Sequence, residues 1–351
     1  MTADERQPAA ASNTGAPREG DRFRNRDDSI EPKSLGEVLR WRIDAARRHV
    51  PRPPRVPTPR MTPDLPFLRA NAAAGQAMQP AATWIGHATV LVQAGGLSFL
   101  TDPMFSERAS PLAFAGPRRH VPPGVALDAV PHVDAVLVSH NHYDHLDASS
   151  VGALLEQAGG APRFVVPLGL RPWFERRGAA DVVELDWWQS TRIGDCEIVL
   201  VPAQHWSGRG LSDRMKTLWG GFAVFTRDLQ FFFAGDTGYS HDFSEMHVRF
   251  EARHGGPGRG FDLALIPIGA YEPRWFMRRQ HVDPREAVQI HRDVAAACSI
   301  GIHWGTFELT DESLDEPPAA LSLACHDAGL AEGEFVVLAI GQTLRLPRRV
   351  E

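Results

Sequence analysis

Cysteine is scarce in this chain of 351 residues, which contains only three. Cys196, Cys298 and Cys325 lie far apart, so they suit neither the disulfide framework of a small secreted domain nor a cysteine-rich zinc site. We therefore expect a protein of a reducing compartment.

Long apolar runs are also missing. No stretch approaches the ~20 apolar residues that cross a bilayer, and residues 1–6 contain no apolar core of a signal peptide. We expect a cytoplasmic protein, and peripheral contact with a membrane stays open.

The chain also lacks an excess of positive charge. The formal net charge is −6, and residues 1–60 hold 13 Lys and Arg against 9 Asp and Glu. The first 60 residues thus carry +4, which leaves −10 for residues 61–351. Because nucleic acid attracts basic surfaces, we expect no nucleic-acid partner.

The chain does contain a dense cluster of metal-binding residue types at 140–145, with the sequence His-Asn-His-Tyr-Asp-His. It follows the apolar run 136–138, which predicts a buried strand that opens into a loop. Imidazoles with a carboxylate favour zinc or another divalent transition metal over calcium or magnesium. The sequence therefore predicts a metal-binding loop.

The spacing within this loop predicts two incomplete ligand sets. His140 and His142 can point to one side of the turn, while Asp144 and His145 point to the other. Three further candidates stand where later apolar runs end: His205, Asp236 and His303. Each one alone fits a core or turn position equally well, but together they supply the ligands that the loop lacks.

The pattern HxHxDH, followed by His, Asp and His at strand ends, resembles the metallo-β-lactamase superfamily. The resemblance implies an α/β fold, the αββα four-layer sandwich of the metallo-β-lactamase type, with two Zn²⁺ per chain. Its diiron branch usually has a carboxylate at the position of His142, which favours the hydrolytic zinc branch. The ligands that the resemblance implies are His140, His142 and His205 for one ion, Asp144, His145 and His303 for the other, and Asp236 as the bridge.

Runs outside the ligand set resemble the N-acylphosphatidylethanolamine-hydrolysing phospholipase D family. These runs are 83–89, 99–103, 139–147, 232–239, 268–277, 280–284 and 302–307. The resemblance implies a zinc-dependent phosphodiesterase with a phospholipid substrate, releasing N-acylethanolamine and phosphatidic acid. Two alternatives stay open. One is a metal-dependent hydrolase of the same superfamily, a lactonase or another phosphodiesterase, acting on a soluble metabolite; the other is a non-catalytic lipid-binding protein.

The same resemblance singles out the pair Gln280 and His281, because the family carries a functional Gln-His pair there. His281 is a candidate proton donor to the leaving alkoxide or a group that positions the phosphate. We count it, with the ligand Asp144, as catalytic. The candidate substrate contacts are Tyr143, Gln280, Arg274 and Trp275.

The chain divides into an N-terminal arm and a catalytic domain. We expect residues 1–60 to be mostly disordered or extended with one short helix, and residues 61–351 to form the domain. Residues 1–34 lack periodic apolar positions, so we expect disorder there and little effect of their removal. Residues 35–43 predict an amphipathic helix, which either packs on the domain or lies on a membrane ahead of the basic segment 51–57. A homodimer also stays open.

Three aspartates carry local signals. Asp102 ends a predicted hairpin, where it either supports the metal loop, as in the resembled superfamily, or starts a turn. Asp147 predicts the start of a helix that ends by Gly159, and Asp283 with Glu286 predicts a capping box.

Overall fold

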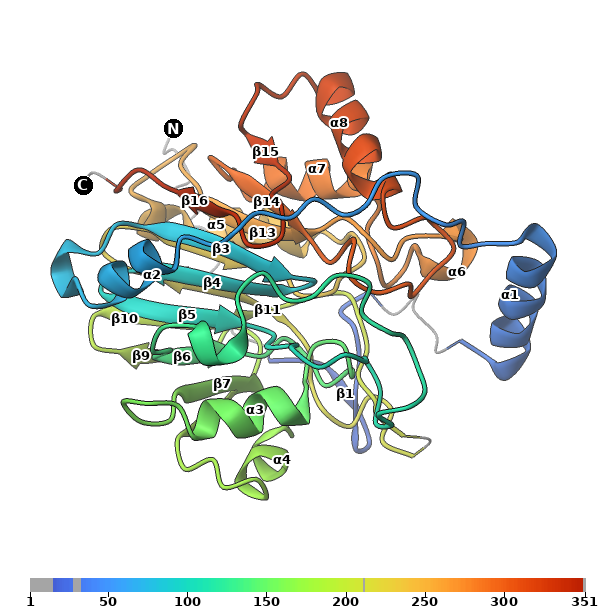
Figure 1. The fold of residues 1–351 in the computed structure, drawn as a ribbon, viewed down its shortest axis with the longest axis horizontal. Helices are drawn as coiled ribbons and strands as arrows, with labels where there is room; N and C mark the ends of the chain where they lie inside the picture. The colour runs from blue at the N-terminus through green and yellow to red at the C-terminus, as the bar shows by residue number, and fades with distance from the viewer. Residues whose placement is uncertain (1–14, 28–32, 211, 350–351) are drawn as a thin grey trace, which may run out of the picture.

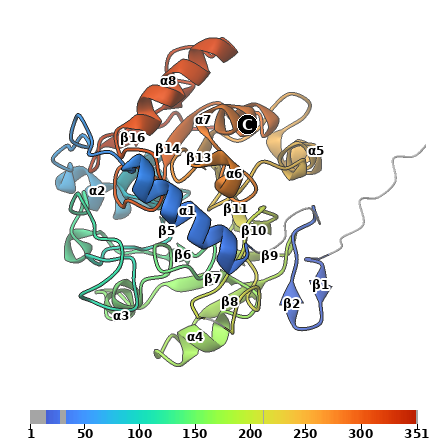
Figure 2. The ribbon, with the colours of Figure 1, turned by 90° about the vertical axis from the view of Figure 1, so that its right-hand side faces the viewer.

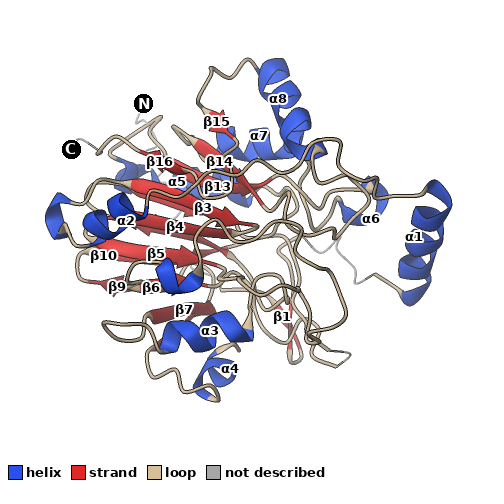
Figure 3. Ribbon diagram, viewed as in Figure 1, coloured by secondary structure: helices blue, strands red, loops and turns tan. Residues whose placement is uncertain are grey.

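The computed structural model describes residues 15–27, 33–210 and 212–349. In this part of the chain two seven-stranded sheets face each other, and helices cover both outer faces (Figures 1 and 3). The predicted αββα sandwich is therefore confirmed.

The first sheet combines an antiparallel and a parallel part. In spatial order its strands are β16 (Thr343–Arg345), β3 (Ala81–Gly86), β4 (Thr89–Ala94), β5 (Leu97–Thr101), β6 (Ala135–Leu137), β7 (Arg163–Pro167) and β8 (Val182–Leu185). Neighbours pair antiparallel from β16 to β5 and parallel from β5 to β8. The sequence did not predict β16, which returns from the end of the chain to pair with β3.

The second sheet repeats this plan. In spatial order its strands are β15 (Phe335–Val336), β14 (Ser299–Ile302), β13 (Leu263–Pro267), β12 (Gln230–Phe233), β11 (Gly221–Phe225), β10 (Cys196–Val201) and β9 (Ser190–Ile193). Pairing is antiparallel from β9 to β12 and parallel from β12 to β15.

Alternation along the strands builds two apolar layers, because successive side chains of a strand point to opposite faces. On β5, Phe99 joins the core between the sheets, while Leu100 joins the core under the helices. Between the sheets Phe99 meets Phe231 with ring centroids 5.4 Å apart, and Trp84 stacks on Trp304 at 5.0 Å. Both faces of the central strands are thus buried, in the first sheet at β5 and in the second at β11, β12 and β13.

The outer helices complete the four layers. The first sheet is covered by α2 (Leu65–Ala72), α3 (Ala148–Leu155) and α4 (Arg171–Glu175), and the second by α5 (Asp242–His254), α7 (Pro284–Asp293) and α8 (Glu316–Ala328). Shorter elements are α6 (Arg274–Met277) and the 3₁₀ turns η1 (Gly75–Ala77) and η2 (Leu127–Ala129). Among the described residues, no helix is long and apolar enough to cross a membrane.

The predicted caps are present. Asp283 and Glu286 form a reciprocal capping box at the start of α7, and Asp147 accepts hydrogen bonds from the first turn of α3. The predicted end of α3 is wrong, since the helix stops at Leu155 rather than continuing to Gly159.

The predicted amphipathic helix is α1 (Leu35–Arg48), which is longer than the predicted span 35–43. Its buried Trp41 packs on Phe276 and Met277 of α6. One face of the helix therefore packs on the domain, and the remainder of α1 projects at the end of the molecule that faces the viewer in Figure 2.

Our expectation of disorder is wrong for residues 15–27. They form a hairpin of β1 (Arg18–Glu19) and β2 (Arg22–Phe23), and the buried Phe23 also donates its backbone N–H to Met215. A few isolated contacts, such as those of Phe23, hold this segment on the domain. Isolated contacts leave no periodic pattern in the sequence. Residues 1–14 and 28–32 of the same prediction lie outside the described residues.

Candidate metal centre

The predicted ligands meet at one edge of the two sheets because each follows the end of a strand. The loop that carries the motif begins after β6, while His205 follows β10, Asp236 follows β12 and His303 follows β14 directly. All seven predicted ligands come together, and five of them are almost completely buried: His140, His145, His205, Asp236 and His303.

The first ligand group consists of three histidines. His140 Nε2 lies 2.8 Å from His142 Nδ1, which in turn lies 3.3 Å from His205 Nε2. These are the three residues expected to hold one ion, and their nitrogens converge as the sequence predicts.

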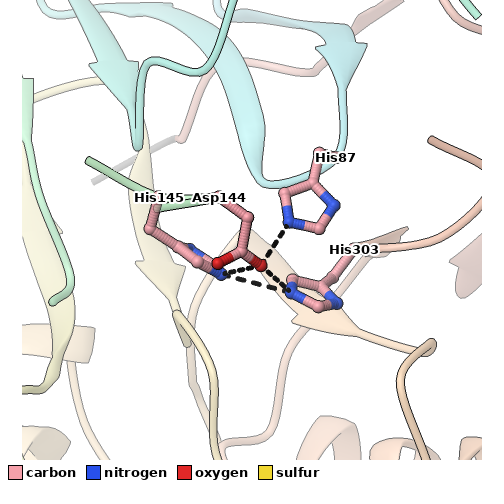
Figure 4. A group of neighbouring side chains, drawn as sticks. All are labelled: His87, Asp144, His145 and His303. Atoms are coloured by element: carbon pink, nitrogen blue, oxygen red, sulfur yellow. Dashed lines mark hydrogen bonds and ion pairs between the residues drawn. The ribbon is translucent and has the colours of Figure 1, made fainter. Parts of the chain in front are cut away.

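The second group consists of Asp144, His145 and His303 (Figure 4). Asp144 Oδ2 lies 3.3 Å from His145 Nε2 and 3.5 Å from His303 Nε2, and the two Nε2 atoms are 3.2 Å apart. The structure adds His87 to this group, which sequence reasoning missed.

Asp236 lies between the two groups. Its Oδ2 is 3.0 Å from His145 Nε2 and 3.9 Å from His140 Nε2, while its Oδ1 is 3.1 Å from His303 Nε2. This placement suits the predicted bridging role.

The donor set fits metal ions, because two imidazoles have their tautomers fixed by groups that only accept. His145 Nδ1 lies 2.6 Å from Asp102 Oδ2, and His205 Nδ1 lies 2.9 Å from the carbonyl of Gln280. Each Nδ1 therefore carries the hydrogen, so the lone pair of a neutral ring at Nε2 faces the Asp236 carboxylate. Positive charge between this nitrogen and the carboxylate, from a proton on Nε2 or from a bound metal ion, removes the repulsion.

The electrostatics of these buried groups also favour bound positive charge. Burial disfavours a charged His303 ring, yet the Asp236 carboxylate raises its pKa to about 9. Burial likewise opposes ionisation of Asp236, but His145 holds the pKa of this carboxyl well below its usual value. In both cases the attraction between opposite charges exceeds the cost of burial.

Asp102 supports the metal loop, as the resemblance implied. Besides His145, it accepts hydrogen bonds from Ser139 N at 2.7 Å and Ser139 Oγ at 2.6 Å. One buried carboxylate thus fixes both the start of the loop and the ring of a ligand.

Asn25 holds His205 from the N-terminal segment, a contact that the sequence did not predict. Its side-chain amide donates to the His205 carbonyl at 2.9 Å and accepts from the His205 N–H at 3.0 Å. Trp219 Nε1 also donates to Asn25 Oδ1 at 3.2 Å. Because 180 residues separate Asn25 from His205, no local pattern connects the two.

A cavity of about 300 Å³ opens beside the ligands. Its lining includes the ligands His142, Asp144 and Asp236, the apolar side chains of Trp41, Trp206, Phe276 and Met277, and the cationic side chains of Lys33 and Arg214. The predicted pair Gln280 and His281 lines it as well.

His281 faces the centre. Its Nδ1 lies 4.0 Å from Asp236 Oδ2, is buried, and makes no hydrogen bond to the described residues. Burial lowers the pKa of His281 to about 3, so the ring is neutral near pH 7. Gln280 contributes through its backbone carbonyl, which orients His205.

Three predicted substrate contacts do not line this cavity. The Tyr143 hydroxyl donates to the carbonyl of Arg209 at 3.2 Å, and the Arg209 guanidinium covers the Tyr143 ring. Arg274 is bound by Glu286 at 2.6 Å, and Trp275 is half exposed on α6. Tyr143 and Arg274 therefore have partners within the protein.

Comparison with protein families and with known proteins agrees with this geometry. A family model described as "Beta-lactamase superfamily domain" matches residues 98–304. The chain is 44% identical over 272 residues to N-acyl-phosphatidylethanolamine-hydrolyzing phospholipase D 1 from Caenorhabditis elegans. The alignment covers 74% of each of the two chains. It is 37% identical to the mitochondrial N-acyl-phosphatidylethanolamine-hydrolyzing phospholipase D of Saccharomyces cerevisiae, over 71% of this chain and 53% of the yeast protein.

Solved structures share the fold at low sequence identity. An isothiocyanate hydrolase from Delia radicum gut bacteria aligns with a TM-score of 0.58 and 19% identity, over 76% of this chain and 99% of that one. Igni18, a metallo hydrolase from Ignicoccus hospitalis, aligns with a TM-score of 0.54 and 17% identity, over 76% and 97% of the chains. These likenesses concern the fold alone.

We predict that the purified protein binds two equivalents of divalent metal per chain, and that Asp236→Asn binds fewer because the shared carboxylate charge is lost. Elemental analysis after dialysis measures both. The exposed Asp128→Asn serves as the control and should keep two equivalents. One equivalent or none in the wild type would contradict the two-site centre.

We predict that Asn25→Ala lowers the free energy of unfolding by about 2–4 kcal/mol, because it leaves buried backbone groups of His205 without partners. Urea unfolding measures the change, and metal analysis should show weaker retention of one equivalent. Arg24→Ala, which removes only a surface ion pair on the same segment, should cost less than about 1 kcal/mol. Equal stability of the two variants would refute the role of Asn25.

Proposed function

Because this chain belongs to the β-lactamase superfamily and, within it, to the N-acylphosphatidylethanolamine-hydrolysing phospholipase D family, we propose that it is a zinc-dependent phosphodiesterase of the phospholipase D type. The proposed substrate is N-acylphosphatidylethanolamine, and the products are N-acylethanolamine and phosphatidic acid. The observation that carries the proposal is an apolar cavity with two cationic side chains, directly beside two ligand groups that share Asp236.

Two zinc ions bound by these groups would supply the positive charge that activates water and neutralises a phosphodiester. Water adds to phosphorus, the bond from phosphorus to the ethanolamine oxygen breaks, and that oxygen leaves with a proton. The chain's own contribution is to hold the ligands rigidly, through Asp102, Gln280 and Asn25, and to enclose the reacting phosphate in a cavity of limited size.

The cavity suits an anionic amphiphile. Trp41, Trp206 and Phe276 form an apolar wall that acyl chains can contact. Arg214 lines the same cavity, and its buried Nε has no hydrogen-bond partner among the described residues. An unpaired guanidinium N–H is a strong donor to a phosphate oxygen, so Arg214 replaces Arg274 as our candidate for the headgroup.

The exposed face of α1 supports contact with a lipid surface. Leu35, Leu39 and Ile43 repeat every four residues and are 88%, 62% and 42% exposed. Arg40 and Arg48 on the same helix have mostly exposed side chains, which favours anionic lipid. Because Val38 and Trp41 of α1 also line the cavity, a membrane under this helix would lie next to the entrance of the active site.

The test of the function is a substrate panel. With zinc bound, the protein should hydrolyse N-acylphosphatidylethanolamine in vesicles and a soluble nitrophenyl phosphodiester, but no lactone. A chelator should abolish both activities, and added zinc should restore them. Turnover of the lactone alone would favour a hydrolase of soluble metabolites, and no turnover by the metal-loaded protein would favour a lipid-binding protein.

A variant of α1 completes this panel. Leu35→Asp with Leu39→Asp should lower turnover in anionic vesicles at least about tenfold, since each leucine buried in lipid contributes about 1.5 kcal/mol or more. Turnover of the soluble phosphodiester should not change. Val248→Asp with Leu323→Asp, which alters exposed apolar residues on α5 and α8, is the matched control and should behave as wild type.

We predict that His281→Asn lowers kcat about 10²-fold on lipid and on the nitrophenyl phosphodiester alike, with metal content unchanged. The enclosed ring next to Asp236 suits a group that positions the phosphate. A nitrophenolate leaves without a proton donor, so activity retained selectively on that substrate would instead restore the proton-donor role.

A further inference from the structure

His87 is a buried histidine beside Asp144, His145 and His303. It is not one of the seven predicted ligands, so its function is open. It occupies the turn between β3 and β4 and points toward Asp144 (Figure 4). Its Nε2 lies 3.0 Å from Asp144 Oδ2, the same oxygen that faces His145 and His303.

The backbone of His87 is fixed in an uncommon conformation. Its φ of +55° lies in the left-handed region, which residues other than glycine rarely adopt. Three hydrogen bonds hold it there: His87 N–H donates to Thr306 Oγ1 at 2.9 Å, and the His87 carbonyl accepts from Trp84 Nε1 at 2.9 Å and from His303 N–H at 3.0 Å. Strain that is maintained by several contacts at a functional site indicates that the position of the side chain matters.

The ring is also enclosed. Its centroid lies 4.0 Å from that of the ligand His303, and Phe307 meets it edge-on at 5.2 Å. These contacts leave Nε2 directed at the Asp144 carboxylate, which can only accept a hydrogen bond when ionised.

We propose that His87 is a positioning residue that donates Nε2–H to Asp144 and thereby orients this carboxylate toward the second metal ion. Asp144, His145, His303 and the shared Asp236 already offer four donors, the number that a tetrahedral zinc site uses. The role that remains for His87 is to donate a hydrogen bond to the Asp144 carboxylate. This inference rests on the proposed dinuclear zinc centre.

The test compares two variants by metal binding rather than by activity. His87→Phe keeps a ring of similar size but lacks the donor, while His87→Gln places an amide N–H near the position of Nε2. His87→Phe should bind the second zinc equivalent about 10–100-fold more weakly, the usual effect of losing a hydrogen bond to a ligand. His87→Gln should remain within a few-fold of wild type, and all proteins should bind the first equivalent equally.

Zinc titration against a competing chelator gives the two affinities, and the absorption spectrum of the cobalt-substituted protein reports the geometry of the second site. His291→Gln, which alters another buried histidine bonded to Ser299, is the control and should change neither. If His87→Phe does not fold, His87→Ala replaces it in the comparison.

Three outcomes are informative. Equal loss of the second equivalent in His87→Phe and His87→Gln would identify His87 as a direct ligand and overturn the proposal. Unchanged affinity in both variants would reduce His87 to a packing role and also overturn it. A wild type that binds fewer than two equivalents would instead refute the dinuclear centre itself, which separates the two failures.

Discussion

The structure depends on the burial of the Asp236 and Asp102 carboxylates together with several imidazoles. Removing such groups from water costs several kcal/mol per charge, which only nearby opposite charge can offset. Asp236 lies within 4 Å of ring nitrogens from both ligand groups, and Asp102 binds the outer nitrogen of His145. A cation at this place satisfies all of these groups at once, so metal binding and the stability of the loops around it are coupled.

The convergence of the seven candidate ligands could be predicted from the sequence because each follows a strand, and strand ends that lie at one edge of a sheet must meet. The dense loop at 140–145 supplied a spacing that chance rarely produces. The helix caps at Asp147 and Asp283 could also be predicted, since a cap depends on residues within one turn. These signals either lie within one helical turn or recur at the ends of successive strands.

The residues that sequence reasoning missed act over long distances. Asn25 reaches His205 across 180 residues, and His87 reaches Asp144 across 57. Neither contact leaves a periodic pattern. Arg274 is the opposite case, because a basic residue beside aromatic residues suggested a headgroup contact, and the structure shows an ion pair of its guanidinium with Glu286 on the next helix.

The same short segments build the apolar cavity and the candidate metal centre. Trp206 of the cavity wall follows the ligand His205, and its ring meets that of His142 at 4.1 Å. Met277 lies three residues before Gln280, whose carbonyl orients His205. Trp41 on α1 packs against Phe276 and Met277, which connects the exposed helix to this wall. A close-packed interior transmits displacements of its side chains. A change in how α1 or the wall packs would therefore reach His205, so access to the cavity and the geometry of the candidate ligands are linked through shared packing.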